Sequence, residues 1–132
     1  WDGYPKEREK FYKLIQSSQS NLILAGDSHN SWISNLFSKQ KKFVGIEIGA
    51  PSISSPNFVD AFGDMVDPID KSFIETNKNL IWTNGKNKGY VELEIYSEFI
   101  EVKFNYVSTV KSKRYNKLKP ISFKINHNKP LI

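Results

Sequence analysis

The chain has 132 residues, which is enough for one domain with an apolar core and too few for two. It contains no cysteine, which excludes disulfides, thiolate zinc sites and a cysteine nucleophile, and its two histidines exclude an all-histidine metal cage. The net charge of +5 comes largely from scattered lysines, which favours a solvated surface over a dedicated anion-binding face. No apolar run approaches the ~20 residues of a membrane-spanning helix, so we expect no membrane span.

The amino-terminal half is predicted to alternate helices with strands. Apolar residues at helical spacing predict an amphipathic helix over Lys6–Ser18. A short apolar run predicts a strand over Asn21–Gly26, and the near-continuous apolar segment Phe43–Gly49 predicts a second strand that is buried on both faces. Between these strands, four apolar residues at helical spacing predict a short helix over Ser31–Ser38.

The carboxy-terminal half is predicted to contain helices first and strands after them. One or two short helices, broken near Pro68, are expected over Asn57–Thr76. Their core candidates are Phe58, Phe62, Met65, Ile69, Phe73 and Ile74. Alternating residues over Gly89–Tyr96 and Phe99–Val110 predict a β-hairpin, and Ile121–Ile125 predicts a last strand. The sequence therefore predicts an α/β unit with a mixed sheet and a β-hairpin.

The most informative segment is Gly26-Asp27-Ser28-His29, which ends the first predicted strand. Asp27 and His29 offer an oxygen and a nitrogen beyond the carboxyl end of a strand, which is where open α/β sheets bind ligands. Gly26 is expected to let the backbone turn. Asp27 and His29 are therefore candidate ligands for a hard divalent or trivalent metal ion. The alternative is a turn in which Asp27 caps a following helix and His29 forms a local hydrogen bond.

Two other segments each have a functional and a plain interpretation. The Pro51–Pro56 loop, with Ser52, Ser54 and Ser55, is either the wall of an anion pocket or a rigid connection. No base lies next to these serines in the sequence, so no serine nucleophile is predicted. The basic stretch Lys111–Lys119 is either a binding surface for an anionic polymer or a partner protein, or a solvated loop. We favour the solvated loop and do not expect nucleic-acid binding.

Several separate segments of the chain are informative when their order and spacing are considered together. They are Trp1-Asp2-Gly3-Tyr4-Pro5, the strand that runs into Gly26–His29 and on to Ser31-Trp32, Glu47 with Pro51–Pro56, Gly89-Tyr90-Val91, and Phe104–Val110. Together they resemble the carboxy-terminal part of PhoD-type alkaline phosphatases, members of the calcineurin-like metallophosphatases. The chain departs from the family pattern at Asn77-Lys78-Asn79-Leu80, where the family has Asn-Pro-His-Leu, and at Lys88, where an arginine is common.

The resemblance implies a layered α/β sandwich and the hydrolysis of phosphomonoesters or diesters at a binuclear metal site. In that site His29 matches the last histidine ligand and Asp27 occupies the place of the preceding one, and the oxygen of Asp27 favours iron or calcium. Asn30 and the Ser52–Ser55 loop, which includes Ser54, become candidates that support the metal ligands or line the pocket, and Trp1 and Tyr4 become packing residues near the site. Family members are usually exported, so a periplasmic or secreted location follows from the resemblance.

The resemblance also implies that the site is incomplete in this chain. The other ligands of the family come from earlier sequence blocks, and none of these blocks occurs between Trp1 and Ile132. Since the sequence also begins without an initiator methionine, we expect residues 1–132 to be a single unit, the carboxy-terminal fragment of a larger phosphatase. Its partner is then the amino-terminal part of the same phosphatase, and the isolated chain is expected to be inactive. The rival hypothesis is a non-catalytic basic binding module.

Overall fold

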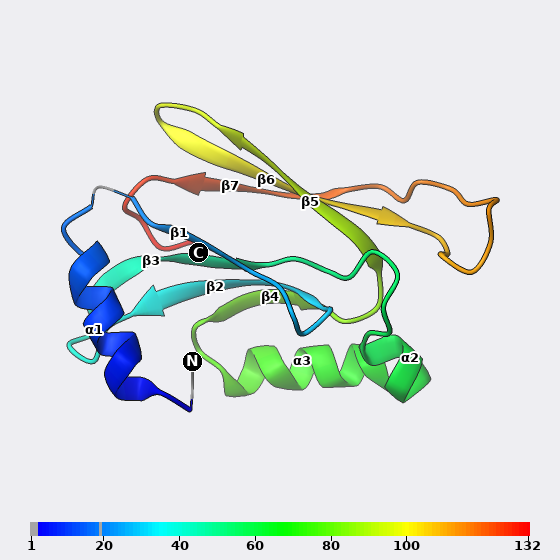
Figure 1. The fold of residues 1–132 in the computed structure, drawn as a ribbon, viewed down its shortest axis with the longest axis horizontal. Helices are drawn as coiled ribbons and strands as arrows, with labels where there is room; N and C mark the ends of the chain where they lie inside the picture. Colours follow the sequence, from blue (N-terminus) through cyan, green and yellow to red (C-terminus); the bar gives the residue numbers. More distant parts are fainter. Residues whose placement is uncertain (1–2, 19) are drawn as a thin grey trace.

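The computed structural model describes residues 3–18 and 20–132, which form two stacked β-sheets with helices at their margins (Figure 1). In chain order the elements are α1 (Pro5–Ile15), β1 (Leu22–Ala25), β2 (Ser31–Phe37), β3 (Phe43–Gly49), α2 (Phe58–Phe62), the 3-10 turn η1 (Gly63–Met65), α3 (Val66–Thr76), β4 (Leu80–Asn84), β5 (Lys88–Ile95), β6 (Phe99–Val107) and β7 (Ile121–Asn126). Within the part of the chain that is described, none of the helices has the length and apolar character needed to cross a membrane.

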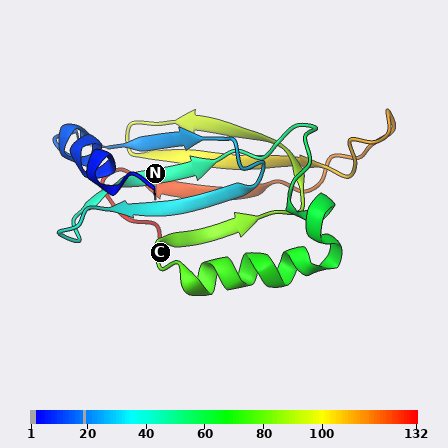
Figure 2. The ribbon, with the colours of Figure 1, turned by 60° about the horizontal axis from the view of Figure 1, so that its bottom comes forward.

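The two sheets differ in strand direction. The first sheet has the order β1-β3-β2-β4 and is mixed, because β1 runs parallel to β3 whereas β2 is antiparallel to both of its neighbours. The second sheet has the order β5-β6-β7 and is antiparallel throughout. Figure 2 shows the sheets as two layers, with α3 running alongside β4. The predicted α/β unit, with its mixed sheet and β-hairpin, is confirmed.

The main core lies between the two sheets. Its buried residues are Ile33, Ile46, Ile48, Ile100, Val102, Phe104, Tyr106 and Ile125. Trp82 on β4 closes one side of this core, with its ring centroid 4.7 Å from that of Phe104 and 5.2 Å from that of Phe123. A smaller cluster on the other face of the first sheet buries Tyr12 of α1 against Leu36 and Val44. The first sheet is therefore covered on both faces, which explains the near-continuous apolar character of β3.

The predicted helix over Ser31–Ser38 is wrong, because this segment forms the interior strand β2. Its apolar residues imitate a helical period since the strand is buried on both faces: Ile33 points into the main core, while Leu36 lies under α1. The pairing of β2 with β3 also shifts register between Leu36 and Phe37. This bulge breaks the simple alternation by which a strand is recognised.

The region between β3 and β5 also differs from expectation. The helical break falls at Gly63, which has a positive φ of 54°, and not near Pro68, which is accommodated in the first turn of α3. Of the six core candidates, Phe62, Met65, Phe73 and Ile74 are exposed, and the fully buried residue is Val66. Strand β4 was not predicted at all.

β1 forms one edge of the first sheet. One of its sides pairs with β3, and within the described residues no strand lies along the other side. Leu24 on this strand is 62% exposed. With Ile53, Tyr90 and Leu93, among others, it lines an apolar pocket of about 310 Å³ between β1 and β5. The edge of the first sheet is thus open and apolar.

Candidate functional site

The turn from β1 to β2 carries the predicted metal ligands in a strained backbone. Asp27 has a φ of 71° and His29 a φ of 63°, both in the left-handed region that side chains other than glycine rarely occupy. Gly26 has no positive φ, and a Cβ atom added to it would meet nothing within 4 Å. The expectation that Gly26 allows the turn is therefore wrong. Strain of this kind is characteristic of functional sites.

This strain should be measurable at Asp27. We expect the Asp27→Gly chain to be more stable than the Asp27→Ala chain by about 1 kcal/mol, because glycine adopts the left-handed conformation without steric cost. Denaturant unfolding of the two variants gives the difference. Ser28 provides the control, since it has no positive φ and alanine should be the more stable replacement there. Equal stability of Asp27→Gly and Asp27→Ala would contradict the strained conformation.

His29 is held by a carbonyl group. Its Nδ1 atom lies 2.6 Å from the backbone oxygen of Pro56. Because a carbonyl oxygen only accepts hydrogen bonds, Nδ1 carries the proton in the neutral ring and the lone pair is left on Nε2. Metal-binding histidines usually show this arrangement, in which the ring nitrogen that does not bind the metal donates to a carbonyl or carboxylate. The ring of His29 thus keeps its lone pair on Nε2, the nitrogen through which a metal ion would be bound.

Two further hydrogen bonds attach the turn to the segment between β3 and α2. The Phe58 amide donates to Asn30 Oδ1 over 3.3 Å, and the Ser52 amide donates to the His29 carbonyl over 3.3 Å. Asn30 is buried, so its side chain joins the turn to α2. The structure therefore brings His29, Asn30 and the predicted serine loop together.

The serines of the loop differ in their surroundings. The Ser52 hydroxyl donates to the Ser55 carbonyl over 2.7 Å, which closes a turn within the loop. The side chains of Ser54 and Ser55 are exposed. A pocket role for Ser52, Ser54 and Ser55 stays a prediction.

Asp27 is exposed, and its carboxylate makes no hydrogen bond or ion pair within residues 3–18 and 20–132. The alternative in which it caps a helix is wrong, because the strand β2 follows the turn. In the same residues, no three His, Cys, Asp or Glu side chains are grouped so that they could hold a metal ion. An exposed carboxylate and an imidazole with its lone pair on Nε2 are two groups that suit a metal ion, and the described residues group no third one with them.

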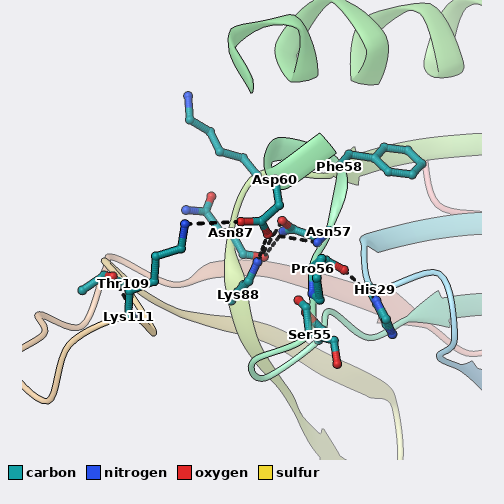
Figure 3. Close-up of polar contacts among 12 residues, drawn as sticks. His29, Ser55, Pro56, Asn57, Phe58, Asp60, Asn87, Lys88, Thr109 and Lys111 are labelled. Carbon is teal, nitrogen blue, oxygen red and sulfur yellow. Dashed lines mark hydrogen bonds and ion pairs between the residues drawn. The ribbon is translucent and has the colours of Figure 1, made fainter. Parts of the chain in front are cut away.

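A charged cluster that sequence reasoning missed lies beside this turn (Figure 3). The Lys88 ammonium group contacts the carboxylate of Asp60 and donates to Asn57 Oδ1 over 3.1 Å. The Lys88 hydrogen bond, aided by the backbone amide of Asn57, lowers the pKa of Asp60 below its ordinary value. The only signal for this cluster in the sequence was the position of Lys88 before Gly89-Tyr90, since Asp60 belongs to a distant segment.

The remaining sequence predictions concern surface residues. Every residue of Lys111–Lys119 is exposed, Tyr115 by 55%, and the Lys111 ammonium nitrogen lies 3.8 Å from Asp60 Oδ1. The solvated loop favoured from the sequence describes this stretch. Tyr4 is 71% exposed within this chain, so its packing role in the whole protein stays a prediction, and Trp1 lies outside the described residues.

Comparisons with known proteins agree on one family. The family model of PhoD-like phosphatases matches residues 1–104. Alkaline phosphatase D of Bacillus subtilis (strain 168) is 44% identical over 61 residues, which is 42% of this chain and 10% of that protein. A solved structure described as "Structure of PhoD" superposes with a TM-score of 0.78 at 26% identity, covering 97% of this chain and 25% of the other. The chain thus spans a quarter or less of the length of these relatives.

Proposed function

Because the chain belongs to the PhoD-like phosphatase family, we propose that it is part of a metal-dependent phosphoesterase and supplies Asp27 and His29 to a binuclear metal site. The observation that carries this proposal is the orientation of His29, whose Nδ1 atom is bound to the Pro56 carbonyl so that Nε2 is left to act as a ligand. The exposed carboxylate of Asp27 stands two residues away, on the same strained turn. The imidazole nitrogen suits iron, and the carboxylate oxygen suits harder ions such as iron or calcium.

The residues of this chain would have distinct tasks in phosphate ester hydrolysis. When bound, the two metal ions supply an activated water and stabilise the charge that develops on the phosphoryl oxygens. His29 and Asp27 would hold their positions through the turn itself, since the backbone of both residues lies in the left-handed region. Asn30 fixes this turn to α2, and the Ser52–Ser55 loop forms the nearest wall for a phosphate ester.

We also propose that residues 1–132 are the carboxy-terminal unit of a larger phosphatase domain, whose amino-terminal part carries the other metal ligands. The coverage of the relatives supports this, because the chain corresponds to 25% of the solved PhoD chain. The absence of any group of three metal-ligating side chains from the described residues supports it as well. Export to the periplasm or the cell exterior, which the family resemblance suggests, belongs to the same proposal.

The test compares the 132-residue chain with the longer protein that contains it. Both are assayed with p-nitrophenyl phosphate and bis(p-nitrophenyl) phosphate, which distinguish monoesters from diesters. We expect turnover by the longer protein, its loss on chelation and its recovery with added iron and calcium, and no turnover by the chain alone. Turnover by the chain alone, or full activity of the longer protein after complete metal removal, would contradict the proposal.

A further inference from the structure

The ion pair between Lys88 and Asp60 connects to His29 through a single peptide group. Lys88 begins β5 and Asp60 lies in α2, and their side chains are only 11% and 24% exposed. The ion pair is formed through Asp60 Oδ2. This atom contacts the Lys88 ammonium group and also accepts a hydrogen bond from the Asn57 amide over 3.1 Å. A half-enclosed ion pair at this place is therefore part of the architecture around the turn.

The Asn57 amide belongs to the same peptide group as the Pro56 carbonyl. One end of this planar group donates to Asp60 Oδ2, and the other end accepts the hydrogen bond of His29 Nδ1. The orientation of the imidazole is thus determined by a peptide plane that the carboxylate holds from the opposite side (Figure 3). A negative charge on the amide side also polarises the carbonyl, which makes it a stronger acceptor for His29.

Lys88 in turn holds the carboxylate and the neighbouring side chain. Its ammonium group donates to Asn57 Oδ1 over 3.1 Å, and the Asn57 side-chain amide reaches the Asn87 carbonyl over 3.5 Å. Asn57 is buried, so its side chain has no freedom to leave this arrangement. Lys111, by contrast, is 82% exposed and touches only the outer oxygen of Asp60, 3.8 Å away. Of the two lysines near Asp60, it is therefore Lys88 that fixes the Pro56–Asn57 peptide group.

We propose that Lys88 and Asp60 are positioning residues for His29, acting through the Pro56–Asn57 peptide to hold Nε2 toward the metal. The part of this inference that concerns metal rests on the proposed function, whereas the orientation of His29 does not. The pair replaces the carboxylate that often lies directly behind a metal-binding histidine, with one peptide group inserted between them. Neither Lys88 nor Asp60 needs to touch substrate or metal.

The orientation can be measured in the 132-residue chain without metal, from the two-bond proton–nitrogen spectrum of its two histidines. The spectrum is recorded at about pH 8 and reports which ring nitrogen carries the proton. We expect His29 to carry its proton on Nδ1. His127 should carry its proton on Nε2, because Nε2 lies 3.0 Å from the Tyr96 carbonyl while Nδ1 faces the Ser20 hydroxyl. The two histidines are therefore expected to show opposite tautomers, so His127 serves as a reference for His29 in the same spectrum.

Substitution of Lys88 then tests the link. In Lys88→Gln we expect His29 to lose its single tautomer, whereas Lys88→Arg should retain it because the guanidinium group keeps the ion pair. Lys103→Gln is the matched control, since Lys103 pairs with Glu94 and Glu101 on the outer face of β6 and is also largely covered. If Lys88→Gln does not fold, Asp60→Asn removes the same ion pair while its amide oxygen still accepts from Asn57.

The longer phosphatase gives the second readout. We expect Lys88→Gln to raise the dissociation constant for added iron by about 10- to 100-fold, with recovery in Lys88→Arg. A wild-type His29 protonated on Nε2, or a His29 spectrum unchanged in both Lys88→Gln and Asp60→Asn, would overturn the positioning role whatever the metal result. If His29 changes as expected but no metal binds, the positioning role stands and the proposed function fails.

Discussion

In the longer phosphatase proposed to contain this chain, replacing His29 by alanine is expected to lower kcat/KM for p-nitrophenyl phosphate by about 1,000-fold, or about 4 kcal/mol of transition-state stabilisation. The imidazole is the only nitrogen ligand that the turn offers, and a hydrogen bond of 2.6 Å already fixes its orientation. Alanine removes that ligand and leaves the Pro56 carbonyl without its donor. Steady-state kinetics and the metal content of the purified variant should fall together.

His127→Ala is the control for this experiment. His127 is the second of the two histidines in the sequence, and it contacts Ser20 and Tyr96 instead of the turn. Its activity and metal content should match those of the wild type. Full activity of His29→Ala with undiminished metal would exclude His29 as a ligand. Loss of activity with undiminished metal would instead assign His29 a role in substrate handling and contradict its assignment as a ligand.

Replacing Gly89 by alanine is expected to cost about 3 kcal/mol of folding stability. A Cβ atom at this position would lie 1.9 Å from the backbone oxygen of Asn105 and 3.0 Å from the Cα atom of Tyr106. These atoms belong to the paired strand β6, so no side-chain rotation relieves the clash. The Gly89 amide also donates to the Ser52 carbonyl over 3.0 Å, so any displacement of β5 disturbs the serine loop as well.

Gly26→Ala is the matched control for Gly89→Ala, because its Cβ atom would meet nothing within 4 Å. We expect it to change the free energy of unfolding by no more than about 0.5 kcal/mol. Denaturant unfolding of both variants, followed by intrinsic tryptophan fluorescence, gives the comparison. A Gly89→Ala chain as stable as Gly26→Ala would mean that β5 and β6 do not approach each other as closely as described here.

Local sequence pattern predicted the elements that have a regular polar and apolar alternation, and it also predicted β3 from its near-continuous apolar run. The amphipathic helix α1 and the hairpin of β5 and β6 show such patterns, and both are confirmed. It failed for β2, which is buried on both faces and interrupted by a bulge, and for the short strand β4. In these cases the partners that cover the element decide its structure, and they come from distant parts of the chain.

The candidate site also has one part that the sequence predicts and one part that it does not. Asp27 and His29 stand two positions apart on one turn, so their proximity follows from the sequence alone. The contact of His29 with Pro56 and the ion pair of Lys88 with Asp60 join residues that are 27 and 28 positions apart. Such contacts depend on how the loop after β3 folds back against β1, which neither periodicity nor motif spacing specifies.

The open side of β1 has a consequence for how this chain behaves in solution. A strand edge with unpaired amide and carbonyl groups is a template for another strand, and the apolar Leu24 and Tyr90 beside it favour that contact. Without a segment that covers the edge of β1, we expect the chain to self-associate as the protein concentration rises. Preparations for spectroscopy are therefore best kept dilute, and a lysine at Leu24 would act as a gatekeeper against such self-association.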